Sequence, residues 1–328
     1  NRLRFAVLFL YFALHIDWAC RRIFVVCFLG KDDGTDLAAQ TKLRYLFVPM
    51  FVGGIPQQSC KRQESFLSVK KHTFVVCAYG ESPYLEDCVK SVVSQTTESD
   101  ICIATSTPNS LIDSVSRKYQ IPLCIRDGES GIAEDWNFAI SCAETDLVTV
   151  AHQDDVYLSG YSSRLLSVYA KNPDLLLFFT NYGELRNGEP VDSNGLLSVK
   201  RAMLFPIRDG RLMRSTFARR RILSFGSAIC CPSVAFNLRY LQQPIFESTM
   251  KCDLDWQAWE KISRQKGAFY YDSRILMRHR IHEESETTHL IEDNTRGRED
   301  LEMLGRFWPS CVARLIYRAY STSQRSNG

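Results

Sequence analysis

The feature that most constrains this chain is a regular alternation of short apolar runs and amphipathic segments between residues 72 and 155. The apolar runs, such as "HTFVVCAYG" and "DLVTVAHQDD", have the length and β-branched content of buried strands. The intervening segments place their apolar residues on one helical face, and the first starts with Ser82 as a cap and Pro83 in the first turn. This alternation predicts a parallel, doubly wound sheet, in which ligands bind at the carboxyl ends of the strands.

The same patterns divide the whole chain into expected elements. The first half has strands at 72–80, 100–107, 121–127 and 146–155, and helices at 82–96, 109–119 and 131–143. The second half has helices at 159–174 and 253–267, strands at 175–185 and 268–282, a strand–turn–strand at 226–237 and an Arg-rich connector at 193–222. We therefore expect an N-terminal extension of unassigned fold at 1–66, one main domain at 67–290, and a charged helix with a basic amphipathic tail at 291–328.

Composition and missing motifs argue against several classes of protein. The formal net charge of +3 does not suit a dedicated nucleic-acid binder. The twelve cysteines contain no CxxC pair, so neither a zinc site nor a disulfide framework is expected. No GxxxxGK[ST] motif occurs, and no GxGxxG follows the first strand, which argues against a P-loop NTPase and a dinucleotide-binding dehydrogenase. No apolar stretch reaches about 18 residues, the usual length of a membrane span.

Two adjacent carboxylates, Asp154 and Asp155, end the fourth expected strand. Adjacent like charges repel and lose hydration when they are partly enclosed. One carboxylate is enough to cap a following helix, so the pair favours a bound cation. One or two carboxylates with substrate phosphates are the usual ligands of Mg²⁺, and a nucleoside diphosphate held in this way needs no glycine cradle.

Six motifs, weak one by one but strong in this order, resemble those of family 2 glycosyltransferases. They are "VVCAYGESPYLEDCVKSVVSQT", "STPN", "GIAEDWNFA", "HQDD", "DLDWQAW" and "RHRIHEESETT", and they span roughly residues 70–288. The resemblance implies an inverting, metal-dependent enzyme with the GT-A fold. That fold is α/β and Rossmann-like, with a mostly parallel mixed sheet flanked by helices in a single main domain. The implied cofactor is Mg²⁺ or Mn²⁺.

The resemblance also implies roles for individual residues on the donor side. The expected contacts with the nucleotide sugar are Cys77, Ala78, Tyr79, Glu81, Ser106, Thr107, Asp135, Asp154 and Arg280. Many family members carry Asn where this chain has Gly80. Asp155 is the expected direct metal ligand, Asp154 is expected to face the ribose or the water shell of the metal, and His282 is expected to complete the metal site.

The segment "CDLDWQAW" resembles the helix start that carries the general base in the family. The Asp before the Trp, Asp255, is the expected base. This chain has Leu254 where the family often has Glu, and Asp253 is the alternative carboxylate near the same helix start. The chemistry needs one carboxylate that takes the proton of an acceptor hydroxyl as its oxygen attacks the anomeric carbon.

We therefore expect transfer of a sugar from a nucleoside diphosphate sugar, with uridine as the expected nucleoside, to a hydroxyl acceptor. The resemblance implies a glycan or lipid-linked acceptor in surface glycan synthesis. The basic amphipathic segment at the C-terminus is consistent with a cytoplasmic protein that lies on the anionic inner face of a membrane. Two alternatives stay open at this point. One is a nucleotidyltransferase, although "AYGESPYLED" lacks the Gly-rich basic loop of that class. The other is a non-catalytic module that binds nucleotide sugars or glycans, which the departure at Leu254 keeps open.

Overall fold

The computed structural model describes residues 12–17, 22–27, 71–282 and 295–325. Its contacts divide the chain into two compact units, residues 1–66 and 67–328, each of which is described by itself. In the first unit, β1 (Phe12–Asp17) pairs antiparallel with β2 (Arg22–Cys27). Among the described residues, no helix has the length and apolar character needed to cross a membrane.

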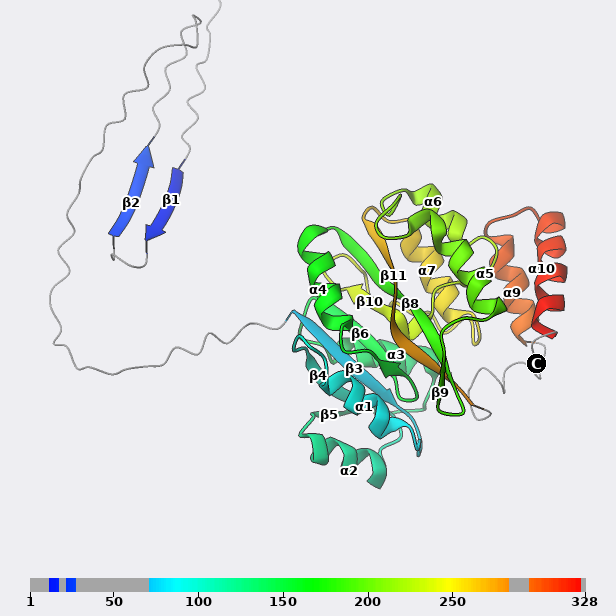
Figure 1. Ribbon diagram of the computed structural model, residues 1–328, viewed down its shortest axis with the longest axis horizontal. Helices are drawn as coiled ribbons and strands as arrows, with labels where there is room; N and C mark the ends of the chain where they lie inside the picture. Colours follow the sequence, from blue (N-terminus) through cyan, green and yellow to red (C-terminus); the bar gives the residue numbers. More distant parts are fainter. Residues whose placement is uncertain (1–11, 18–21, 28–70, 283–294, 326–328) are drawn as a thin grey trace, which may run out of the picture. The chain divides into compact units, whose positions relative to one another are not determined.

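A mixed sheet of nine strands forms the centre of the second unit (Figure 1). Its strands are β3 (His72–Ala78), β4 (Asp100–Thr105), β5 (Leu123–Ile125), β6 (Leu147–His152), β7 (Val156–Tyr157), β8 (Leu175–Arg186), β9 (Glu189–Val191), β10 (Val234–Asn237) and β11 (Ala268–Ile281). Their order is β5-β4-β3-β6-β10-β8-β11-β7, and β9 pairs with β8. The pairs β3–β4, β3–β6, β4–β5 and β8–β11 are parallel, whereas β10 runs antiparallel to both β6 and β8. The expected α/β fold with a mixed sheet is confirmed.

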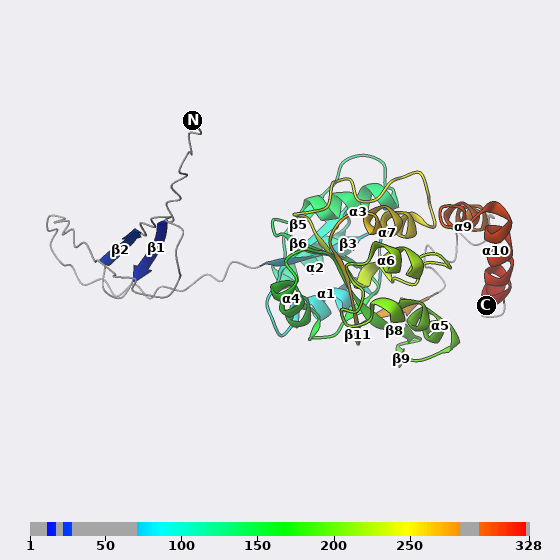
Figure 2. The same cartoon turned by 90° about the horizontal axis from the view of Figure 1, so that it is seen from above.

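Helices cover both faces of this sheet (Figure 2). They are α1 (Leu85–Val93), α2 (Ser110–Tyr119), α3 (Ile132–Ser141), α4 (Tyr161–Lys171), α5 (Gly195–Leu204), α6 (Thr216–Ile222), α7 (Leu254–Ser263), α9 (Thr295–Gly305) and α10 (Ser310–Arg325). Along β3 the side chains alternate between two cores, as the two-residue period of a strand requires. Phe74 and Val76 join the core that includes residues of α1, α2 and α4, and Val75 joins the core that includes residues of α3, α6, α7 and α9.

The structure differs from two local expectations and defines the elements of the Arg-rich connector. Helix α1 begins at Leu85 rather than at Ser82, whose hydroxyl instead accepts a hydrogen bond from the N–H of Tyr84. The connector at 193–222 contains two α-helices, α5 and α6, whose N-caps are Asn194 and Ser215. The segment at 226–237 holds only the strand β10: the expected turn is the 3₁₀ turn at Cys231–Ser233, but residues 226–230, where the first strand was expected, form no strand.

The C-terminal helices are part of the same core as the sheet. Met303 and Leu304 on α9 and Ala313 on α10 are almost completely buried. The indole N–H of Trp308, between the two helices, donates to the backbone oxygen of Ser224 at 2.6 Å. Helix α9 therefore has a fixed position relative to the segment that follows α6.

Candidate active site

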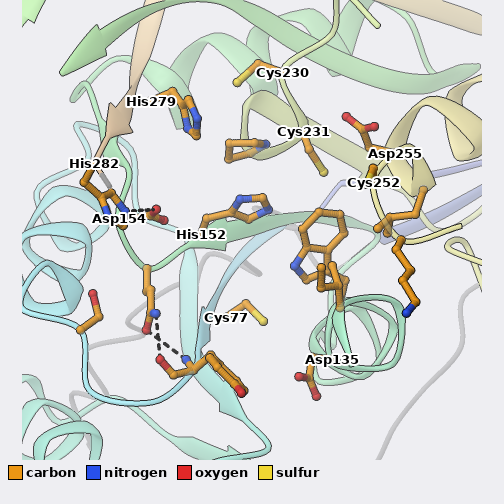
Figure 3. A pocket seen from close by; sticks show the side chains of 18 of the residues that line it. Cys77, Asp135, His152, Asp154, Cys230, Cys231, Cys252, Asp255, His279 and His282 are labelled. Carbon is orange, nitrogen blue, oxygen red and sulfur yellow. Dashed lines mark hydrogen bonds and ion pairs between the residues drawn. The ribbon is translucent and has the colours of Figure 1, made fainter. Parts of the chain in front are cut away.

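A cavity of about 810 Å³ lies where the carboxyl ends of β3, β6 and β11 meet the start of α7. Figure 3 shows its labelled side chains on opposite walls, with Asp154 and His282 on one side and Asp255 and Cys252 on the other. Such a position at the ends of parallel strands is where open α/β sheets bind ligands. Its two walls come from segments that lie far apart in the sequence.

The loop after β3 is held by side chains from the ends of two neighbouring strands. The amide of Gln153, after β6, makes two hydrogen bonds to the backbone of Tyr79: its Oε1 accepts from the N–H at 3.0 Å and its Nε2 donates to the C=O at 2.9 Å. The N–H of Gly80 donates to Thr107 Oγ1 at 2.7 Å. Gly80 has φ of +58°, a conformation that Gly adopts freely and Asn tolerates best among other residues. The ring of Tyr79 is half exposed on the cavity wall.

Asp135 on α3 lines the same cavity, and two hydrogen bonds hold its carboxylate in place. Arg126 Nε donates to its Oδ1 at 2.8 Å, and Ser106 Oγ donates to its Oδ2 at 2.9 Å. The next residue, Trp136, stacks on His152 with ring centroids 4.7 Å apart. Burial lowers the pKa of His152 to about 4, so this imidazole is neutral in its stack. Ser106 therefore supports Asp135 from outside the cavity wall.

The two adjacent carboxylates after β6 have different surroundings. Asp155 is completely buried, and its Oδ1 accepts from the backbone N–H of Arg280 at 3.0 Å and lies 2.9 Å from His279 Nδ1. Asp154 lines the cavity, and its Oδ2 lies 3.0 Å from His282 Nε2 (Figure 3). Asp154 therefore faces the cavity, while Asp155, the expected direct metal ligand, is bound at the end of β11.

Arg280, which was expected to contact the nucleotide sugar, does not line the cavity. Its Nε donates to the backbone oxygen of Asp154 at 2.8 Å. Its guanidinium lies 4.3 Å from the ring centroid of Tyr84 and 3.6 Å from a carboxylate oxygen of Asp87. Arg280 therefore fixes the backbone of the Asp154 turn.

The start of α7 presents Asp255 to the cavity. Its Oδ1 accepts from the N–H of Trp256. Burial raises the pKa of Asp255 to about 6, although Trp256, Lys200 and Arg296 act in the opposite direction. Asp253 is 3% exposed, and burial, followed by repulsion from Asp300 and Asp255, raises its pKa to about 9. At neutral pH, Asp255 is thus mainly ionised and Asp253 is protonated.

The model of a family described as "Glycosyl transferase family 2" matches residues 73–245, about half of the chain. The chain belongs to glycosyl transferase family 2. This stretch contains the expected donor-side residues up to Asp155 and ends before the start of α7.

Two solved structures show the same fold as this family 2 chain. The crystal structure of S. aureus TarS 1-349 in complex with UDP-GlcNAc is 13% identical, with a TM-score of 0.54, over 75% of this chain and 70% of that chain. The mannosyltransferase PcManGT from Pyrobaculum calidifontis, in complex with GDP-Man and Mn2+, is 12% identical, with a TM-score of 0.51, over 79% of this chain and 76% of that chain. At these identities the likeness shows the GT-A fold alone. No curated protein matches the chain.

The side chains of this family 2 site suit a metal that the substrate helps to bind. In the described part of the chain, no group of three or more His, Cys, Asp or Glu side chains is arranged to hold a metal. Asp154 Oδ2 and His282 Nε2 lie 3.0 Å apart on the cavity wall, and Nδ1 of His282 is buried without a hydrogen-bond partner. A carboxylate oxygen and an imidazole nitrogen suit Mn²⁺, and carboxylate oxygens suit Mg²⁺, when phosphate and water oxygens complete the coordination.

The expected site residues therefore fall into two groups. Those on the cavity wall are Cys77, Tyr79, Glu81, Asp135, Asp154, Asp253, Asp255 and His282. Those that do not line it are Ala78, Ser106, Thr107, Asp155 and Arg280. The cavity also contains residues that the sequence reasoning missed: His152, Gln153, Lys200, His279 and Arg296. His152 and Gln153 stand beside Asp154 in the motif, but Lys200 and Arg296 come from segments with no motif to mark them.

Proposed function

We propose that the chain transfers a sugar from a nucleoside diphosphate sugar to a hydroxyl acceptor with inversion at the anomeric carbon. The observation that carries this proposal is that one cavity has a candidate general base on one wall and candidate metal ligands on the other. Asp255, a carboxylate with a pKa of about 6, lies on one wall, and Asp154 with His282 lies on the other (Figure 3). A carboxylate with this pKa suits a general base near neutral pH.

On the donor side we assign the nucleoside to the loop after β3 and to α3. The half-exposed ring of Tyr79 offers a surface on which a base can stack, and the fixed carboxylate of Asp135 can accept hydrogen bonds from the base or ribose. Cys77 and Glu81 also line the cavity. TarS with UDP-GlcNAc and PcManGT with GDP-Man support a nucleoside diphosphate donor, and uridine remains the nucleoside we propose.

For the diphosphate we assign a divalent cation, Mg²⁺ or Mn²⁺, held by Asp154 and His282. When bound, this cation neutralises the negative charge that develops on the leaving diphosphate. His279 lines the same wall. Burial opposes the charged form of His279, but the attraction of Asp155 and Asp154 outweighs it and raises its pKa.

For the acceptor we assign Asp255 as the general base. As the acceptor oxygen attacks the anomeric carbon, its proton passes to the carboxylate of Asp255, and the bond from that carbon to the diphosphate oxygen breaks on the opposite face. Attack opposite the leaving group inverts the configuration. Asp253 is protonated at neutral pH and is therefore the weaker candidate. A glycan or lipid-linked sugar of a surface polysaccharide is the acceptor class that the family resemblance suggests.

A donor screen by calorimetry tests the proposal. The full chain is titrated with UDP-, GDP- and TDP-sugars with and without Mn²⁺, beside Asp154→Ala and Asp255→Ala. Binding that needs Mn²⁺, is lost in Asp154→Ala and persists in Asp255→Ala is the expected result. Absence of binding to every nucleotide sugar would refute the transferase function, and binding with no nucleotide release by the wild type would favour a non-catalytic module.

A further inference from the structure

One carboxylate on α9 binds three consecutive backbone amides of the segment that leads into α7. The oxygens of Glu299 accept from the N–H of Lys251 at 3.0 and 3.1 Å, of Cys252 at 2.8 Å and of Asp253 at 3.1 Å. The side chain of Glu299 is almost fully buried, with 6% exposed. Hydrogen bonds to a buried charged acceptor are among the stronger ones in proteins, so this contact fixes the path of the chain there.

The segment that Glu299 holds carries a wall of the cavity. Lys251, Cys252 and Asp253 line it, and Asp255 follows within the first turn of α7. The Asp255 carboxylate accepts from the N–H of its own neighbour Trp256, so its direction is tied to the helix backbone. Any displacement of the 251–253 segment would therefore move this carboxylate as well.

Helix α9 is itself a rigid support. Met303 and Leu304 anchor it in the core, and both views show it beside α7 (Figures 1 and 2). At its end the ring of Phe307 stacks on Trp256, with centroids 6.5 Å apart and planes inclined by 16°. The first turn of α9 also supplies Arg296 to the cavity wall. Active-site side chains are positioned accurately when the residues that support them belong to a well-packed helix or strand.

We propose that Glu299 is a positioning residue for sugar transfer, which holds the 251–253 segment so that Asp255 meets the acceptor hydroxyl. The inference rests on the proposed function, because it takes Asp255 as the base. It makes α9, which lies outside the family-matched residues 73–245, a working part of the active site. Glu299 touches no substrate, and its effect passes through the backbone of the 251–253 segment.

The test compares Glu299→Ala and Glu299→Gln in the full chain with Glu302→Gln. Glu302 is exposed on the same helix, and its carboxylate pairs with Arg306 at 3.1 Å. The measurements are hydrogen exchange of the 251–253 amides, UDP binding with Mn²⁺, and nucleotide release from the donor that the screen selects among UDP-GlcNAc, UDP-glucose and GDP-mannose. Glu299→Gln keeps one acceptor oxygen, so its effect should lie between those of Glu299→Ala and the wild type.

In Glu299→Ala we expect exchange of these amides to accelerate at least about 10-fold. We expect kcat to fall roughly 10- to 100-fold, because a small displacement of a reacting group has effects of that size. The UDP Kd should change less than about 2-fold, since the donor wall is formed by other elements, and Glu302→Gln should match the wild type.

Three results would overturn the inference: unchanged exchange, faster exchange with unchanged kcat, or a loss that appears in UDP binding instead of kcat. These results count only if the wild-type protein releases nucleotide from the donor in the same assay. A wild type that binds no nucleotide sugar overturns the proposed function itself, and the positioning role of Glu299 is then refuted as well. Should Glu299→Ala fail to fold, Glu299→Gln carries the same comparison.

Discussion

The pH dependence of nucleotide release should report the ionisation of Asp255. Burial raises the pKa of this carboxyl to about 6, from 3.8 in an exposed aspartate. A general base works only when ionised, so activity should be present above pH 6 and lost as the pH falls through it. The ionised fraction is about one half at pH 6 and about one tenth at pH 5, which sets the expected loss in kcat.

Substitutions should alter this profile in a defined way. Asp255→Asn keeps the size of the side chain and an oxygen for the Trp256 N–H, but it cannot take a proton. We expect kcat to fall about 10²- to 10⁴-fold with donor binding retained. Lys200 lowers the pKa of Asp255, so Lys200→Met should move the acid limb to higher pH. Asp253→Asn should leave the limb where it is, because Asp253 is already protonated at neutral pH.

The assay is continuous nucleotide release at saturating donor and Mn²⁺ between pH 4.5 and 8. Calorimetric UDP binding across the same range separates loss of the base from loss of the metal or the fold. The reasoning fails if the acid limb lies near pH 4, where an exposed aspartate titrates, or if Asp255→Asn retains more than about a tenth of the wild-type kcat. It also fails if Asp253→Asn moves the limb.

Three further predictions concern the donor wall and the fold. Asp154→Asn should abolish the Mn²⁺-dependent part of UDP binding in calorimetry. Asp155→Asn should mainly lower the melting temperature in thermal denaturation, because it disturbs a buried pair. The reverse pattern would make Asp155 the direct metal ligand. Gln153→Ala removes both hydrogen bonds to the Tyr79 backbone. It should weaken UDP binding about 5- to 10-fold and leave the melting temperature unchanged. UDP binding equal to that of the wild type in calorimetry would contradict this prediction. Gly267→Ala should lower the free energy of unfolding by about 2–4 kcal/mol in urea denaturation. The reason is that Gly267 has φ of +141° and a Cβ there would lie 2.7 Å from the backbone oxygen of Asp174. A loss below about 0.5 kcal/mol would show that the turn adapts to the extra atom.

The local sequence was enough to predict the sheet and the edge where the site lies. The apolar runs at 72–78 and 147–152 and the helical periodicity of the segments between them are properties of neighbouring residues, which the sequence gives directly. Because parallel strands end at one edge, the paired carboxylates after the fourth expected strand could be expected in a site at that edge before any contact was known. The family resemblance then added Tyr79 and Asp135, and also Asp255 and His282, which follow the matched stretch.

Tertiary structure alone decided which of two neighbouring carboxylates faces the cavity. Asp154 and Asp155 are equivalent by composition, and their difference comes from β11, which brings His279 and Arg280 from more than 120 residues away to bind Asp155. In the same way, the protonation of Asp253 depends on burial and on Asp300 of α9. A pKa and the direction of a side chain depend on what surrounds the group in space, and neighbours in sequence do not specify those surroundings.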